Sequence, residues 1–279
     1  MRRMTNKIIL TIFLIIFRLF AFGQIKFSGT IIDNTTRLPI EYANIGLLEK
    51  GVGTVCNSLG KFELLVPDDL VNNLLVISHL GYETTKLKIN ELKSNSTGLK
   101  IELKPTSIIL QEITVLASRQ VSLGYKPNGN KVTGFFKAAG LGLEGGTLIQ
   151  NNGQVSLTQF NINILKIPFD SLKFRLNFYS VKKDNPSNKI NLKDIIFTIS
   201  KADTGLYSLP LVKENIQVTD NFICTIELIE LFGQSAENAE FLFSAIPNKD
   251  GFIYKKTISL GSWERIKKYS LCFWLTGNK

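Results

Sequence analysis

The feature that most constrains the fold is a two-residue alternation of apolar and polar side chains along much of the chain. It is clearest in LKFRLNFYSV, residues 172–181. The apolar members are Leu172, Phe174, Leu176 and Phe178, and the polar members are Lys173, Arg175, Asn177 and Tyr179. Successive side chains of a β-strand point to opposite faces of the sheet, so this segment predicts a half-buried strand of an antiparallel sheet.

Similar segments recur through the chain and predict an all-β fold. They lie at residues 25–33, 42–50, 60–66, 73–80, 84–90, 98–104, 154–165, 194–200, 220–230, 240–246 and 269–275. Turn-forming stretches such as NSLG, VPDD, NNGQ, KDNPSN and PNKDG separate them. We find no long stretch of helical periodicity. Short strands at this spacing predict β-sandwiches.

The chain divides near residues 105–130. Pro105 closes the first group of strands, SIILQEITVLAS (107–118) is one more extended segment, and LGYKPNGNK (123–131) is polar and rich in turn formers. We therefore predict a β-sandwich at residues 24–105, an extra strand and linker at 106–130, and a second, antiparallel, jelly-roll-like sandwich at 131–279.

The N-terminus predicts a cleaved signal peptide at residues 1–23. Basic residues are followed by the apolar run IILTIFLIIF (8–17), and AFGQ (21–24) offers small residues before a cut after Gly23. The apolar run is shorter than the roughly 20 residues that span a bilayer. An uncleaved anchor is the alternative. We expect an exported protein, in the periplasm or associated with the cell surface or outer membrane, with no transmembrane segment in the mature chain.

Charge and cysteine content exclude several classes of protein. Four cations and no acidic residue lie in the leader, so its removal lowers the net charge from +10 to +6. The remaining cations are dispersed, whereas a nucleic-acid site needs a concentrated basic stripe. Three distant cysteines do not form a disulfide framework. Cys224 alternates with apolar residues and is expected to be buried, and a Cys224–Cys272 disulfide remains open.

The first unit carries an ordered set of motifs. FSGTIIDNTTRLPIEYANIGL (27–47) is followed by GTVCNSLGKFELLVP (53–67), LLVISHLGYET (74–84) and IELKPTSIILQEITV (101–115). This set resembles the carboxypeptidase-regulatory-like domain of Bacteroidetes envelope proteins, which also precedes their TonB-dependent receptors. The resemblance implies a seven-stranded, transthyretin-like sandwich. The second unit resembles a β-sandwich found behind this module in some Bacteroidetes proteins.

Four residues of these motifs have expected structural roles. Gly60 fits a turn that needs a positive φ angle, and Phe62 begins the apolar face of the strand that follows. Gly81 ends a strand and lets Tyr82 fold over the edge of the sandwich.

The sequence argues against catalysis. A zinc carboxypeptidase site needs two histidines and a glutamate, and His79 is the single histidine of the chain. Its neighbour Ser78 points to the opposite face of a strand and so cannot be its nucleophile. We interpret His79 as a packed or edge residue. GLGLEG (140–145) matches a dinucleotide-loop pattern, but a strand rather than a helix follows it. We expect no cofactor and no metal, and we interpret Asp68 and Asp69 as part of a solvated turn.

Two functions remain open. We expect a non-catalytic module of the cell envelope that docks to an unidentified periplasmic or outer-membrane protein through surface loops or an exposed strand edge. The alternative is a carbohydrate-binding accessory protein that uses exposed aromatic residues of the second unit. Tyr179 is the best candidate for a ligand-facing aromatic residue because it alternates away from the apolar face. Trp263, Trp274 and Tyr207 are the others.

Overall fold

The computed structural model describes residues 23–106, 119–129, 132–137, 140–233 and 239–279. The described chain is all-β, as the alternation predicts, and contains one four-residue helix, α2 (Ile89–Leu92). Short 3₁₀ turns are η1 (Asp68–Leu70), η2 (Lys93–Asn95), η3 (Lys201–Asp203) and η4 (Val212–Glu214). The predicted leader up to residue 22 and the predicted strand at 107–118 lie outside the described residues.

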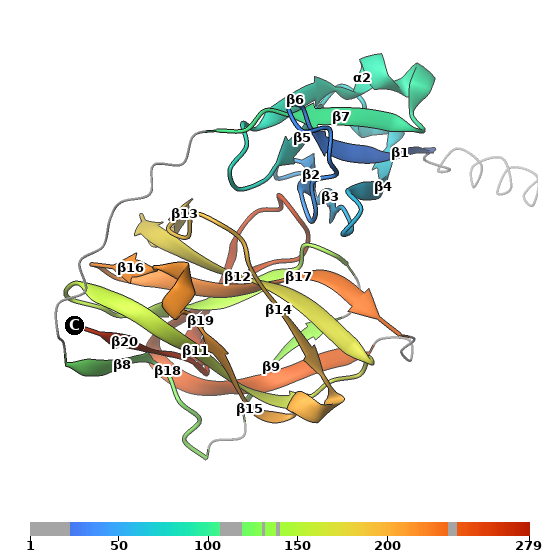
Figure 1. Ribbon diagram of the computed structural model, residues 1–279. Coiled ribbons are helices and arrows are strands. Elements are labelled where there is room, and N and C mark those ends of the chain that lie inside the picture. The colour runs from blue at the N-terminus through green and yellow to red at the C-terminus, as the bar shows by residue number, and fades with distance from the viewer. Residues whose placement is uncertain (1–22, 107–118, 130–131, 138–139, 234–238) are drawn as a thin grey trace, which may run out of the picture.

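The first unit is a sandwich of a three-stranded and a four-stranded sheet (Figure 1). The first sheet has the order β4 (Lys61–Pro67), β1 (Gln24–Asp33), β7 (Leu99–Leu103). The second has the order β3 (Val52–Val55), β2 (Asn44–Leu47), β5 (Leu74–Ser78), β6 (Thr85–Lys88). Alternate residues of both sheets enclose one apolar core, which includes Phe27, Phe62, Leu64, Ile45 and Ile77.

The motif glycines occupy positions that demand glycine. Gly60 has a φ of +68°, and a Cβ there would lie 2.5 Å from the carbonyl oxygen of Ile31. Gly81 has a φ of +82° and follows the end of β5 by three residues. Tyr82 then turns back over the sandwich, where its ring contacts the core and its hydroxyl donates a 2.9 Å hydrogen bond to Asp33.

The second unit is one continuous antiparallel sheet that folds over into two layers. Its path is β13 (Asn185–Lys189), β12 (Ser171–Lys182), β17 (Phe222–Phe232), β10 (Glu144–Ile149), β18 (Glu240–Lys256), β11 (Val155–Lys166), β20 (Phe273–Asn278), β8 (Gln120–Gly124). Side branches are β9 (Val132–Lys137), β14 (Ile195–Ser200), β15 (Gly205–Pro210), β16 (Gln217–Val218) and β19 (Glu264–Leu271). β8 pairs with β20, so residues 120–124, which the sequence predicts as linker, belong to the second unit.

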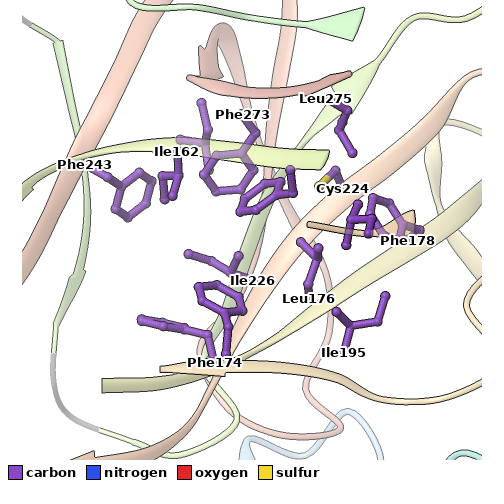
Figure 2. Close-up of a cluster of buried hydrophobic side chains, with 14 of the residues drawn as sticks. Ile162, Phe174, Leu176, Phe178, Ile195, Cys224, Ile226, Phe243, Phe273 and Leu275 are labelled. Carbon is purple, nitrogen blue, oxygen red and sulfur yellow. The ribbon is translucent and has the colours of Figure 1, made fainter. Parts of the chain in front are cut away.

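The main core lies between these layers (Figure 2). Phe174, Leu176 and Phe178 of β12 face inward, as their alternation predicts. Cys224 and Ile226 of β17 share that face, which confirms that the Cys224 thiol is buried. Each fully buried side chain of this size contributes about 1.5–3 kcal/mol to stability.

The outer face of β12 differs from the prediction. Arg175, Asn177 and Tyr179 point away from the core as expected, yet all three are buried. The middle of β12 is therefore covered on both faces rather than half-buried. Polar side chains on adjacent strands and residues of the first sandwich cover the outer face of β12.

Candidate functional site: a buried charge row beneath the first sandwich

Four charged residues form a row across four neighbouring strands of the second sandwich. Arg175 of β12 is paired with Glu227 of β17, Glu227 with Glu144 of β10, and Glu144 with Lys256 of β18. Directly paired residues of an antiparallel sheet point to the same face, so these side chains lie side by side. Arg175, Glu227 and Glu144 are buried, and the Lys256 side chain is 13 % exposed. We call Arg175, Glu227, Glu144 and Lys256 the charge row.

Glu144 is the most heavily bonded member of the charge row. One carboxylate oxygen accepts hydrogen bonds from Asn177 (2.9 Å), the Tyr179 hydroxyl (3.0 Å) and the Thr225 hydroxyl. The other lies 2.7 Å from the Lys256 ammonium. Burial alone would raise the pKa of Glu144, but the charge of Lys256, that of Lys189 and these hydrogen bonds lower it to about 2. Glu144 is therefore held as a carboxylate.

Arg175 links the charge row to the first sandwich. Its Nη1 lies 3.2 Å from Glu227 and its Nε lies 3.1 Å from Asp194, which precedes β14. Its Nη2 donates a hydrogen bond to the main-chain carbonyl of Tyr42, a residue of the first sandwich. The guanidinium donates hydrogen bonds to Glu227 and to the Tyr42 carbonyl and forms an ion pair with Asp194. One buried cation thus joins three segments of the chain.

His79 adds a second polar contact between the sandwiches. It lies one residue beyond β5, where its Nε2 is 3.2 Å from Asp194 and its Nδ1 is 2.7 Å from the carbonyl of Leu80. Burial would raise the pKa of Asp194, whereas the His79 hydrogen bond and the Arg175 charge lower it to about 2. The expected strand-edge histidine is therefore also a contact between the two sandwiches.

A neighbouring contact is centred on Tyr42. Its hydroxyl donates to Glu230 (2.8 Å) and accepts from Lys173 (2.6 Å), while the Lys173 ammonium also lies 2.6 Å from Glu230. The Tyr42 side chain is buried in a small apolar cluster with Val55 and with Ile229 of the second sandwich. The contact between the sandwiches is thus both apolar and ionic.

The loop between β18 and β19 completes the contact. Ser259 donates a 3.0 Å hydrogen bond to Asn44, and the amide of Glu49 donates to the carbonyl of Leu260. Gly53 of β3 approaches so closely that a Cβ there would lie 2.2 Å from the Ser259 carbonyl oxygen. β3, one edge of the four-stranded sheet, therefore faces the second sandwich.

The chemistry of the charge row is that of a structural network. Its carboxylates are paired with cations, and the pKa of Glu144 is lowered, whereas a general acid at neutral pH needs a raised one. Within the described ranges, no group of three histidine, cysteine, aspartate or glutamate side chains is placed to hold a metal ion. Partly buried Lys189 lies over the Tyr179 ring at 5.9 Å, and desolvation followed by repulsion from Arg175 lowers its pKa.

The structure corrects the prediction that Tyr179 faces solvent. Tyr179 is 7 % exposed, its hydroxyl is bonded to Glu144, and Trp263 packs edge-on against its ring at 5.7 Å. The alternation correctly predicts the face of β12 on which Tyr179 lies, but Trp263 and neighbouring side chains cover that face. Trp263, Trp274 and Tyr207 are partly buried. All three cysteines are free and buried, so Cys224 and Cys272 form no disulfide.

Sequence reasoning missed the charge row. Glu144 lies in the segment GLGLEG, whose glycine spacing suggests a nucleotide loop and not a charge pair, and Gly146, two residues on, leaves room for the Thr225 methyl group. A charged residue at the centre of an apolar strand, as Glu227 is in FICTIELIELF, was the available signal. The partners are distant in sequence, so the signal does not identify them.

Comparison with known proteins identifies the first unit. Residues 27–115 match the family model of the CarboxypepD_reg-like domain, which confirms the family to which the motifs pointed. This domain is a non-catalytic β-sandwich module. No curated protein matches the chain.

Solved structures give only distant matches. A chain of T=1 particles derived from infectious bursal virus is 9 % identical with a TM-score of 0.26, and one from the Gt strain of infectious bursal disease virus is 10 % identical with a TM-score of 0.23. Each alignment covers 91 % of this chain, which spans 58 % and 64 % of those chains. No conclusion about fold or function follows from such scores. The described residues include no helix long and apolar enough to cross a membrane.

Proposed function

We propose that the chain is a non-catalytic interaction module of the cell envelope, and that its CarboxypepD_reg-like sandwich docks onto a periplasmic or outer-membrane protein. The domain match supports the non-catalytic part of this proposal. The motif resemblance to Bacteroidetes envelope proteins and the predicted leader at residues 1–23 support the location. A mature protein whose N-terminal residue is Gln24 would verify export.

The observation that carries the docking proposal is the edge formed by β6. Among the described strands β6 pairs only with β5, so its other side carries main-chain donors and acceptors that no described strand occupies. Such an edge can accept a strand from a partner. The opposite edge of the same sheet, β3, is occupied by the second sandwich, and Figure 1 shows β6 on the far side.

A hollow beside β6 would provide specificity. It has a volume of about 330 Å³ and is lined by apolar, basic and asparagine side chains. Leu48 and Leu74 are its exposed apolar members, and Lys50 and Lys86 lie at its rim. An apolar centre with a polar rim is the usual anatomy of a protein interface. The partner segment would be extended, with apolar side chains for the hollow and acidic residues for the lysines.

Site-specific photo-crosslinking in the producing cells tests this proposal. A crosslinking amino acid at Lys86 of β6 is expected to capture a defined envelope protein, whereas one at Lys201 on the second sandwich is not. Leu74→Asp should abolish the capture, and Leu65→Asp, at an exposed leucine on the other sheet, should leave it intact. Equal capture from positions 86 and 201, or capture unaffected by Leu74→Asp, would contradict the proposal.

The carbohydrate-binding alternative has less support. Its best candidate, Tyr179, is buried under Trp263 and bonded to Glu144. Recovery of the mature chain on envelope polysaccharide, with no protein captured from position 86, would favour this alternative.

A further inference from the structure

A pocket of about 460 Å³ lies in the second sandwich between β9, β10, β18 and β19. Its walls are mainly apolar and include Leu143, Phe243, Ala245, Ile253 and Leu271. Three of these residues, Phe243, Ala245 and Leu271, also belong to the main core, so the pocket reaches from the surface to the core. Its volume lies within the range of small-molecule sites, about 300–1,000 Å³.

The pocket continues into exposed apolar surface on β19. Ile266 and Tyr269 line the pocket and remain 41 % and 39 % exposed. Single exposed apolar residues need no explanation, but here two of them extend one apolar wall to the solvent. A long, thin apolar ligand would cover both residues and enter the pocket between them and β10.

The charged groups at the pocket favour an anionic head group. Lys255 lines the pocket, and its side chain is 40 % exposed. Its partner Glu264 lies 3.0 Å away and is 58 % exposed, so this ion pair is weak and Lys255 can turn to a ligand. The deeper Lys256 is committed to Glu144. β19 also carries three cations, Arg265, Lys267 and Lys268, against the single anion Glu264.

We propose that this pocket binds a single-chain anionic amphiphile, with the acyl chain among Phe243, Ile253 and Leu271 and the head group at Lys255. The observations that carry this inference are an apolar cavity, an apolar mouth and a weakly paired cation at one place. The inference is independent of docking through β6, because the pocket lies in the other sandwich.

Calorimetric titration of the full mature chain with monomeric laurate, below its critical micelle concentration, tests the proposal. Saturable binding at one site is expected. 1-Dodecanol, which has the same chain length and no charge, should bind about tenfold more weakly. Phosphatidylglycerol vesicles distinguish a single ligand from a membrane surface. Binding to vesicles without binding to laurate would overturn the proposal.

Two exposed positions give variants that are expected to fold. Ile266→Glu places an anion at the mouth and should weaken laurate binding at least tenfold. Leu206→Glu, an exposed site on β15 away from the pocket, is the matched control and should have no effect. Lys255→Gln should reduce the affinity for laurate several-fold and leave that for dodecanol unchanged. Unchanged laurate binding in Ile266→Glu, or equal losses for both ligands in Lys255→Gln, would refute the assignment.

Discussion

The substitution Glu144→Gln tests the role of the charge row most directly. The amide keeps the shape of the side chain but removes the charge that faces Lys256, leaving a nearly buried cation unpaired. The lowering of the Glu144 pKa from 4.5 to about 2 corresponds to about 3 kcal/mol, at about 1.4 kcal/mol per pKa unit. Removing one partner of a buried pair costs about 3–5 kcal/mol in other proteins. We therefore expect Glu144→Gln to lower the free energy of unfolding by about 3 kcal/mol at pH 7.

Urea unfolding followed by tryptophan fluorescence measures this loss of stability in the second sandwich, which contains the charge row. Trp263 and Trp274 both lie in the second sandwich, and Trp263 packs 4.5 Å from the Lys256 ammonium. Glu264→Gln is the matched control because it makes the same change in the exposed pair with Lys255. An exposed pair contributes at most about 1 kcal/mol, so the control should be nearly as stable as the wild type.

The pH dependence gives a second, independent check. The folded-state pKa of Glu144 is lowered, so its stabilisation is fully present above the unfolded-state pKa of about 4.5 and is lost as the pH falls through about 2. The difference between wild type and Glu144→Gln should therefore shrink between about pH 5 and pH 2. The reasoning is refuted if Glu144→Gln and Glu264→Gln are equally stable at pH 7, or if the difference is the same at pH 2 and pH 7.

Three further predictions concern the contact between the sandwiches and the thiols. Gly53→Ala should force β3 away from the Ser259 carbonyl and lower the free energy of unfolding by about 1–3 kcal/mol. Hydrogen exchange in the β18–β19 loop should increase, and unchanged exchange would argue against this contact. Asp194→Asn should shift the ring proton resonances of His79, the single histidine, and remove a stabilisation that wild type loses as the pH falls through about 2; an unchanged His79 spectrum would contradict the contact. Burial raises the pKa of each thiol, so iodoacetamide should label all three cysteines in denaturant and react only slowly with the native protein.

The fold followed from local pattern. The alternating segments 25–33 and 172–181 became β1 and β12 within one residue at each end, whereas 42–50 became the shorter β2. Sequence reasoning missed several other strands, among them β3, β8, β9, β13, β15, β16 and most of β19. Most of these are short, and β13 and β16 carry little alternation and take their strand character from longer neighbours. Their partners are set by the assembled sheet, so no local signal identifies the pairing.

The site followed only in part, because alternation predicts a face and not what covers it. It correctly directed Arg175 and Tyr179 away from the core. Their burial depends on the first sandwich, on Trp263 and on charged residues that lie at distant positions in the sequence. A polar residue on the outer face of a strand therefore predicts solvent exposure only when nothing else covers that face.

The charge row has a consequence for strand register. Slipping β10 by one residue against β17 would turn Glu144 into the apolar core, and slipping it by two would place Glu144 opposite Ile229 or Thr225 instead of Glu227. Either change separates charges that now compensate one another, at a cost of several kcal/mol for an unpaired buried charge. If the charge row were apolar, the remaining polar residues of the outer face, such as Asn177 and Thr225, would still penalise a one-residue slip. A two-residue slip would then be tolerated, because it keeps these residues on the outer face.

We therefore expect replacement of all four members of the charge row by leucine to retain stability but weaken the specification of register. The measurement is a two-dimensional amide NMR spectrum of the fourfold variant beside that of the wild type. Doubled resonances in β10 and β17, with single resonances in the first sandwich, would show that register is no longer unique. A single set of resonances with the native cross-strand contacts between Gly145 and Ile226 would show instead that the apolar core alone fixes the register, and that the charge row serves only to join the two sandwiches.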